Sequence, residues 1–207
     1  MAHACRARRL VVLLAFLCAA PAAGDTRAKT AGSEAGAADP VSREVGSEHR
    51  EYQIKAAFLL NFIRYTTWPP EAFANPKAPI EVTVVGRDPF GPILEETFAG
   101  ETIEGRRIVV RRERGLPEAL TGHVVFSADL EHVGRAELLR ACRRRPMLLV
   151  GESPDFAAEG ACVNFYLADK KTRFEINTDS LAEAKLVISP AVLKLARIVK
   201  GRREESR

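Results

Sequence analysis

The side chains that could do chemistry in this sequence are few and widely spaced. Apart from His3, the histidines are His49, His123 and His132. Neither His123 nor His132 has a cysteine, a second histidine or a carboxylate at the close spacing of a zinc site. We therefore expect no metal, and we interpret both as surface or capping residues.

Motifs for nucleophilic or nucleotide chemistry are absent from the sequence. It contains no Gly-x-Ser-x-Gly turn. The segment Gly86–Gly91 (GRDPFG) has a proline between its glycines, which favours a turn and a helix start, although a helix N-terminus can bind an anion. Glu175 and Asp179 (in FEINTDS) could act as acid or base, but a turn shaped by Asn177 and a cap at Thr178 or Asp179 explain the cluster better. We therefore expect no catalytic residue, no cofactor and no enzymatic activity.

The first 24 residues have the pattern of a signal peptide. Three arginines precede an apolar run of eleven residues from Leu10 to Ala20, and small residues follow up to Gly24. That order of charge, apolar core and small residues is typical of a cleaved leader. The run is too short to span about 30 Å of hydrocarbon, which takes about 20 apolar residues. The sequence therefore predicts export to the periplasm, with an uncleaved anchor or a lipoprotein that uses Cys18 as alternatives.

Cys5 and Cys18 belong to the expected signal peptide and would be removed with it. The cysteines of the exported chain are therefore Cys142 and Cys162. Two cysteines in an oxidising compartment can pair. Cys142 ends an expected helix, and Cys162 begins an expected strand. They would lie at the same edge of the sheet if that strand ran parallel to the preceding one, and at opposite edges otherwise. A disulfide between them is therefore open at this stage.

The exported chain divides into a tether, one folded domain and a short tail. Residues 25–48 are mostly alanine, glycine, serine and charged residues, which cannot bury enough apolar surface to offset the entropy of ordering. We expect a disordered tether there, a single α/β domain over 49–200 and a charged tail over 201–207. Of the 31 Lys and Arg residues, three lie in the signal peptide, which leaves 28 against 27 Asp and Glu. This near balance does not indicate nucleic-acid binding.

Apolar periodicity predicts strands that alternate with helices. The expected helices cover 51–66, 88–100, 131–143, 180–186 and 191–199, with helical turns at 115–120 and 153–157. The expected strands cover 80–86, 101–112, 123–127, 147–151, 162–167 and 172–176, of which the last two form an antiparallel hairpin. Alternating strands and helices are typical of parallel βαβ units. We therefore expect an α/β fold with a mixed, mostly parallel β-sheet, helices on both faces and an antiparallel hairpin at one edge.

Two regions are candidate contacts for a partner or a ligand. Tyr65, Trp68 and Pro70 follow the first helix and offer apolar surface, although a lone tryptophan at such a place is more often buried in a core. Arg87 and Asp88 follow the first strand, at the carboxyl edge where open α/β sheets bind ligands.

Four blocks of the sequence resemble the YfiR-like family of periplasmic proteins. They are KAAFLLNF from Lys55 to Phe62 with Tyr65, Trp68 and Pro69 after it, GRDPFG from Gly86 to Gly91, Phe165 with FEIN from Phe174 to Asn177, and the ending from Leu186 to Ala196. The resemblance extends from about Tyr52 to Val199. The chain departs from the pattern at Ala161 and Cys162, where relatives usually have a glycine and a methionine. No cysteine pairing of other members is therefore carried over.

The resemblance implies a regulatory protein that makes and breaks no covalent bond. The best understood members of the family bind the periplasmic part of an inner-membrane diguanylate cyclase and hold its output low, and others accompany sensor kinases. The implied partner is thus a diguanylate cyclase, with cyclic-di-GMP control, or a sensor kinase. No nucleic-acid partner is expected, and a homodimer stays open.

Two further functions remain as alternatives. The first is small-molecule binding in the crevice between Gly86–Asp88 and Ser127–Asp129, at the carboxyl ends of two strands. The second is a hydrolase that uses Glu175 or Asp179, which the sequence supports least.

Overall fold

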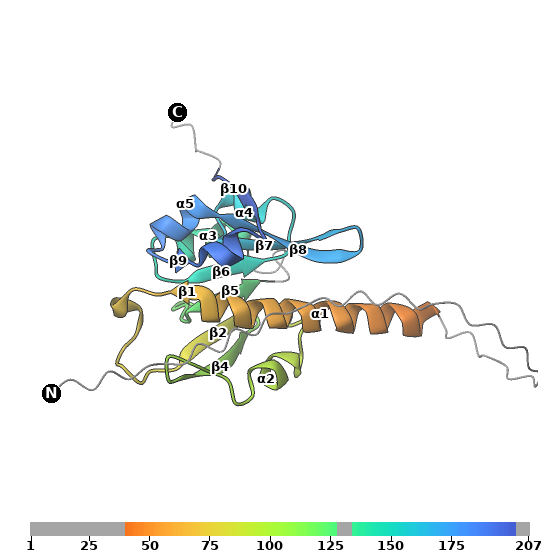
Figure 1. Ribbon diagram of the computed structural model, residues 1–207, viewed down its shortest axis with the longest axis horizontal. Helices are drawn as coiled ribbons and strands as arrows, with labels where there is room; N and C mark the ends of the chain where they lie inside the picture. Colours follow the sequence, from red (N-terminus) through yellow and green to blue (C-terminus); the bar gives the residue numbers. More distant parts are fainter. Residues whose placement is uncertain (1–39, 128–133, 202–207) are drawn as a thin grey trace, which may run out of the picture. The chain divides into compact units, whose positions relative to one another are not determined.

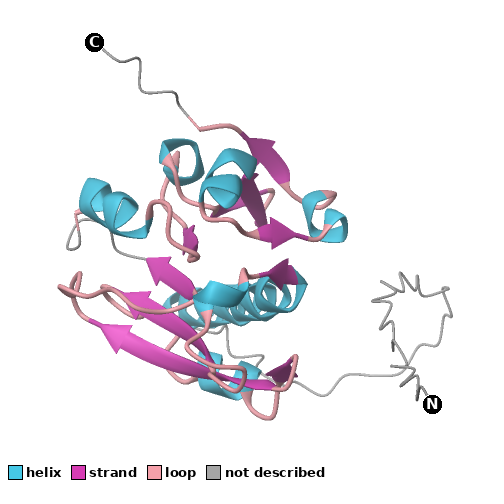
Figure 2. Ribbon diagram, turned by 90° about the vertical axis from the view of Figure 1, so that its left-hand side faces the viewer, coloured by secondary structure: helices cyan, strands magenta, loops and turns pink. Residues whose placement is uncertain are grey.

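A mixed sheet forms the centre of the computed structural model, which describes residues 40–127 and 134–201 (Figures 1 and 2). Within these residues, eight strands follow the order β10-β8-β7-β6-β5-β2-β4-β3. The pairs from β4 to β7 and the pair of β8 with β10 are parallel, whereas β7 with β8 and β3 with β4 are antiparallel. The expected α/β class, with a mixed and mostly parallel sheet, is confirmed.

The elements follow one another without long gaps. In chain order they are α1 (Pro40–Tyr65), β1 (Thr66–Thr67), the 3₁₀ turn η1 (Pro70–Ala72), β2 (Ile80–Val85), α2 (Ile93–Phe98), β3 (Thr102–Ile103), β4 (Arg106–Glu113), β5 (Val124–Ser127), α3 (Arg135–Cys142), β6 (Leu148–Gly151), α4 (Phe156–Glu159), β7 (Val163–Ala168), β8 (Lys171–Asn177), α5 (Thr178–Glu183), β9 (Val187–Ile188), α6 (Pro190–Leu193) and β10 (Arg197–Val199).

Helix α1 packs along one face of the sheet through an apolar stripe at three- and four-residue spacing. Leu59, Phe62 and Ile63 are fully buried or nearly so. The Phe62 ring lies 5.8 Å from the Phe165 ring on β7 and 5.0 Å from the Phe174 ring on β8. Burial of such rings stabilises the fold by about 1.5–3 kcal/mol each. These contacts hold α1 against β7 and β8 of the sheet.

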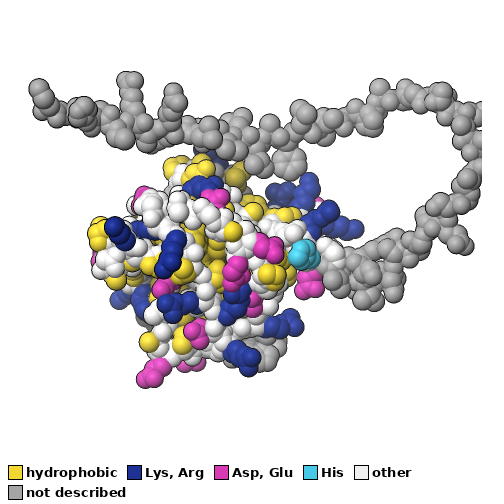
Figure 3. Space-filling view, turned by 90° about the horizontal axis from the view of Figure 1, so that it is seen from below, with side chains coloured by type: hydrophobic (Ala, Val, Ile, Leu, Met, Phe, Trp, Pro, Cys, Tyr) yellow, Lys and Arg dark blue, Asp and Glu magenta, His cyan; other side chains and the backbone are white. Residues whose placement is uncertain are grey.

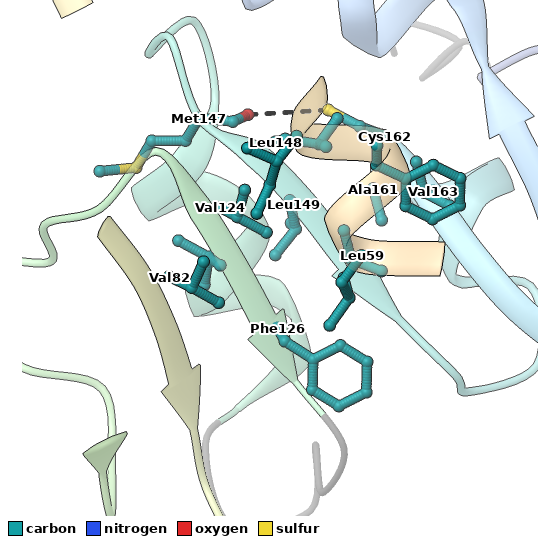
Figure 4. Close-up of a cluster of buried hydrophobic side chains, with 14 of the residues drawn as sticks. Leu59, Val82, Val124, Phe126, Met147, Leu148, Leu149, Ala161, Cys162 and Val163 are labelled. Carbon is teal, nitrogen blue, oxygen red and sulfur yellow. Dashed lines mark hydrogen bonds between the residues drawn. The ribbon is translucent and has the colours of Figure 1, made fainter. Parts of the chain in front are cut away.

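The interior strands are apolar because both of their faces are covered. Every residue of β5 and β6 is buried, as expected for parallel strands between two layers of helices. Figure 4 shows the core that they form with Leu59 of α1, Val82 of β2 and the segment Ala161–Val163. This packing holds the ends of the central strands in fixed positions.

Several expectations about the elements were wrong. Residues 88–92 are a turn, and the helix begins only at Ile93; residues 115–120 are not helical. The segment 191–199 is not one helix, because a short helix ends at Leu193 and β10 follows, so the hairpin is not the outermost pair of the sheet. Residues 40–48, expected as part of a tether, are helical, since α1 begins at Pro40. The expected signal peptide, the rest of the tether and the tail beyond Gly201 lie outside the described residues.

Candidate functional site

The two cysteines lie at the amino edge of the strands, on neighbouring elements. Only residues 152–162 separate β6 from β7, yet the two strands are parallel, which meets the condition for Cys142 and Cys162 to lie at the same edge. Cys162 donates its backbone N–H to Leu149 at 2.9 Å, and its thiol donates to the Met147 carbonyl at 3.8 Å (Figure 4). Cys142, at the end of α3, lines the same cavity of about 640 Å³.

Both cysteines are free and buried in the structure. Burial raises the pKa of the Cys142 and Cys162 thiols to about 12. Thiols with such pKa values are protonated at neutral pH and react slowly, because the thiolate is the nucleophile. The disulfide between the two residues, which the sequence left open, stays open.

The second candidate region consists of Arg87 and Asp88, and only the Asp88 side chain is held by hydrogen bonds within the fold. Asp88 accepts the backbone N–H of Phe90 at 2.8 Å and the Nε of Arg112 at 2.6 Å. The Arg112 guanidinium also contacts Glu95 at 2.5 Å and the Gly91 carbonyl at 2.6 Å. These bonds hold the pKa of Glu95 below its ordinary value. Asp88 thus fastens the turn after β2 to β4 and is not available to a ligand.

Arg87 is exposed and has no ionic partner among the described residues. It stays a candidate contact. The crevice expected between Gly86–Asp88 and Ser127–Asp129 lies partly outside the described residues, because 128–133 are not described. On the described side, Arg112 and its partners occupy the carboxyl end of β2.

The first candidate region forms an exposed apolar patch at the opposite edge of the domain. β1 pairs antiparallel with β9, with Thr67 opposite Val187, and the Tyr65 carbonyl accepts the Ser189 N–H at 2.9 Å. Tyr65 is 46% exposed and Val187 66% exposed. Pro70 follows on the same segment and is exposed. We call Tyr65, Thr67, Pro70 and Val187 the β1–β9 patch.

Trp68 does not belong to the surface of this patch, because it is only 9% exposed. Its ring lies edge-on to His123 at 6.4 Å, and Phe73 stacks on the same imidazole at 4.5 Å. Trp68 therefore supports the patch from below, and the interpretation as a core residue fits its burial.

His123 is a structural residue that ties the segment after β1 to the sheet. Its Nδ1 accepts the Glu81 N–H at 3.0 Å, and its Nε2 donates to the Ala72 carbonyl at 3.1 Å. Burial lowers the pKa of the imidazole. The neutral form with the proton on Nε2 satisfies both bonds.

The polar cluster FEINTDS also serves the fold. Asn177 is the N-cap of α5, since its Oδ1 accepts from Asp179 N at 3.0 Å and Ser180 N at 3.1 Å. The cap was expected one or two residues later. Glu175 is buried and pairs with Arg197 of β10.

Sequence reasoning missed an ionic cluster near the middle of α1. Lys55 is 4% exposed and contacts Glu51 and Glu152 at 2.5 Å each. Tyr52 donates to Glu152 at 3.0 Å, and burial raises its pKa. The available signal was a lysine within the apolar stripe of α1, but its partner Glu152 lies almost one hundred residues further along the chain.

One face of the domain shows no dominant charge. On the face seen in Figure 3, Lys and Arg side chains alternate with Asp and Glu. Among residues 40–127 and 134–201, no group of three or more His, Cys, Asp or Glu residues could hold a metal ion. None of the helices in this part of the chain is long and apolar enough to cross a bilayer.

Taken together, the described residues form an α/β domain whose buried polar groups mostly stabilise the fold and which exposes Tyr65 and Val187 at the β1–β9 patch. A family model described as YfiR/HmsC-like matches residues 52–197. The chain therefore belongs to the YfiR/HmsC-like family, which is a regulatory and not a catalytic family. The resemblance found in the sequence is confirmed, over nearly the whole described domain.

Proposed function

We propose that this protein acts in the periplasm and represses an inner-membrane diguanylate cyclase by binding the periplasmic part of that enzyme. Membership of the YfiR/HmsC-like family over residues 52–197 carries the proposal. The signal-peptide pattern of residues 1–24 supports the compartment. A sensor kinase is the second candidate partner.

The β1–β9 patch is the surface that we assign to the partner. Its centre is apolar, through Tyr65 and Val187, and the ion pair of Lys185 with Glu71 at 3.3 Å lies on the adjoining segments. An apolar centre with a polar rim is the usual composition of a protein interface. Exposed aromatic residues at such a centre commonly carry much of the binding energy.

Binding would shift the partner between two states by mass action. A protein that binds the inactive state of a cyclase better than the active state lowers its output by that difference in affinity. The mechanism needs no catalytic residue in this chain.

The test is a crosslinking pull-down of the tagged protein from its own cell envelope, followed by mass spectrometry. We expect enrichment of one inner-membrane cyclase, and we expect Val187→Asp to reduce it at least tenfold, because a charge would be buried at the interface centre. Leu167→Asp is the matched control, since Leu167 is similarly exposed, at 59% against 66% for Val187, but lies on the β7–β8 hairpin. Equal capture by both variants would remove the patch from the proposal, and no enriched membrane protein would remove the proposal itself.

A further inference from the structure

The cavity of about 640 Å³ beside the two cysteines lies at the amino edge of the parallel strands. Its walls come from α3, from the segments that lead into β6 and β7, and from the start of α5. The volume falls within the usual range for small-ligand sites, roughly 300–1,000 Å³. This edge of the sheet is opposite the crevice expected from the sequence, so the cavity is a separate candidate site.

One side of this cavity is apolar. Cys142 and Met147 line it and are 6% and 5% exposed. A protonated thiol behaves as a small apolar group. Ala136 and Leu139 of α3 line the cavity as well and keep more of their surface open, since Ala136 is exposed and Leu139 is only partly buried. This side therefore suits an alkyl chain.

The other side carries three arginines, two of which have no ionic partner. Arg143 pairs with Glu183 at 3.3 Å. Arg140 and Arg144 also line the cavity; both are exposed and have no carboxylate partner among residues 40–127 and 134–201. Arg140 donates its Nε to the Ala136 carbonyl at 3.3 Å, and its terminal nitrogens keep their donors for a ligand.

The carboxylates that line the cavity do not cancel these charges. Glu183 is bound to Arg143, and Glu159 is bound to Arg135 at 2.6 Å. Asp179 is the third carboxylate, and it accepts a backbone N–H at 3.3 Å. Within the described residues, two unpaired guanidinium groups thus line the cavity against one carboxylate without a cation. An anion is therefore attracted more strongly than a cation.

We propose that this cavity binds a small organic carboxylate with a short alkyl chain. The guanidinium groups of Arg140 and Arg144 would donate to the carboxylate oxygens, because a guanidinium matches a carboxylate with two parallel N–H bonds. The alkyl chain would lie against Leu139, Cys142 and Met147. An inorganic anion could satisfy the arginines but not the apolar side, and an alcohol could do only the reverse. This site is separate from the β1–β9 patch and does not depend on the proposed function.

The test is a titration of the purified, isotope-labelled protein with hexanoate, acetate, inorganic phosphate and hexan-1-ol, followed by amide NMR. We expect hexanoate to shift the amide signals of residues 136–147, with an affinity that falls as salt rises. Acetate and phosphate should bind about tenfold more weakly, because burial of about two methylenes supplies that factor. Hexan-1-ol should be as weak, because it lacks the charge. Absence of these shifts at about 20 mM hexanoate, or equal affinity for phosphate or the alcohol, would overturn the proposal.

Variants locate the site. Arg140→Gln combined with Arg144→Gln should weaken hexanoate binding about tenfold, because the donors to the carboxylate lose their charge. Lys170→Gln combined with Lys171→Gln is the matched control and should bind hexanoate as the unmodified protein does. It also removes two exposed cations, and Lys170, with φ 58°, matches Arg144, with φ 56°. An equal loss in both pairs would mean unspecific attraction of anions and would overturn the proposal.

A change on the exposed face of α3 tests the same cavity without removing an arginine. Ala136→Glu keeps a good helix former and adds a carboxylate to the wall, so it should also weaken hexanoate binding about tenfold. Unchanged affinity in this variant and in the folded arginine pair would exclude the cavity. If the variants do not fold, the comparison of hexanoate with phosphate and the alcohol in the unmodified protein decides.

Discussion

The Asn177 side chain should contribute more to stability than any other single polar side chain near the hairpin. Its Oδ1 caps α5 by accepting two backbone N–H groups at 3.0 and 3.1 Å, and its Nδ2 donates to the Ala157 carbonyl at 2.6 Å. The residue is 0% exposed. One side chain therefore ties α4, β8 and α5 together, and water cannot replace it without local opening.

The expected loss for Asn177→Ala follows from these bonds. Removal of an N-cap costs about 1 kcal/mol. The Ala157 carbonyl would also lose a buried partner, at a cost of about 1–3 kcal/mol. Because the two effects come from separate bonds, we expect the free energy of unfolding to fall by about 2–4 kcal/mol. With a urea dependence of about 2 kcal/mol per molar, the unfolding midpoint would move down by about 1–2 M.

The assay is urea unfolding followed by the fluorescence of Trp68, the single tryptophan, which is buried in the native state. Asn177→Asp is the informative companion. It keeps an oxygen that can cap α5 but places a carboxylate against the Ala157 carbonyl, so it should be destabilised through that contact alone. A midpoint for Asn177→Ala within about 0.3 M of the unmodified protein, equivalent to under 1 kcal/mol, would refute the reasoning.

Three further predictions concern the core, its pH dependence and its thiols. Gly151→Ala should lower the free energy of unfolding by about 1–3 kcal/mol in urea titrations, because the new Cβ would lie 2.3 Å from the Phe156 ring; an unchanged midpoint would contradict this. The lowered pKa of His123 means that the unfolded chain binds its proton first. Stability should therefore fall as the pH drops below about 6.5, and His123→Asn should show a smaller fall between pH 7 and pH 5 in the same titrations. Cys142 and Cys162 should resist iodoacetamide at pH 8 in the native protein, and both should react after denaturation without reductant; if neither reacts then, the two are bridged.

Much of the sheet could be predicted because its strands carry their signal locally. The runs that became β2, β5 and β6 are continuous and apolar, which is typical of strands covered on both faces. The hairpin of β7 and β8 could be predicted from two such runs around a short turn, and its turn residues Asp169 and Lys170 adopt positive φ. Local pattern was sufficient where each element is buried by its neighbours in sequence.

The elements that sequence reasoning missed depend on distant partners. β10 has only three residues, and its pairing with Glu175–Asn177 makes it a strand. β1 and β9 have two residues each and form through each other. The start of α1 was misjudged because residues 40–48 have no apolar stripe, and their helix extends from the anchored part of α1. For the same reason the ionic cluster of Lys55 could not be anticipated, since Glu152 lies 97 residues further along the chain.

The packing of α1 on the far end of the sheet has a consequence for how the protein is made. Tyr52 and Lys55 bind Glu152, 100 and 97 residues further along, and Glu71 pairs with Lys185, 114 residues away. Contacts of such long range form late, because loop closure must precede them. The first helix cannot bury its stripe of phenylalanines until β7 and β8 have been synthesised. For the exported protein that we propose, this topology delays folding on the inner side of the membrane, and so keeps the chain extended and competent for translocation until nearly all of it has been made.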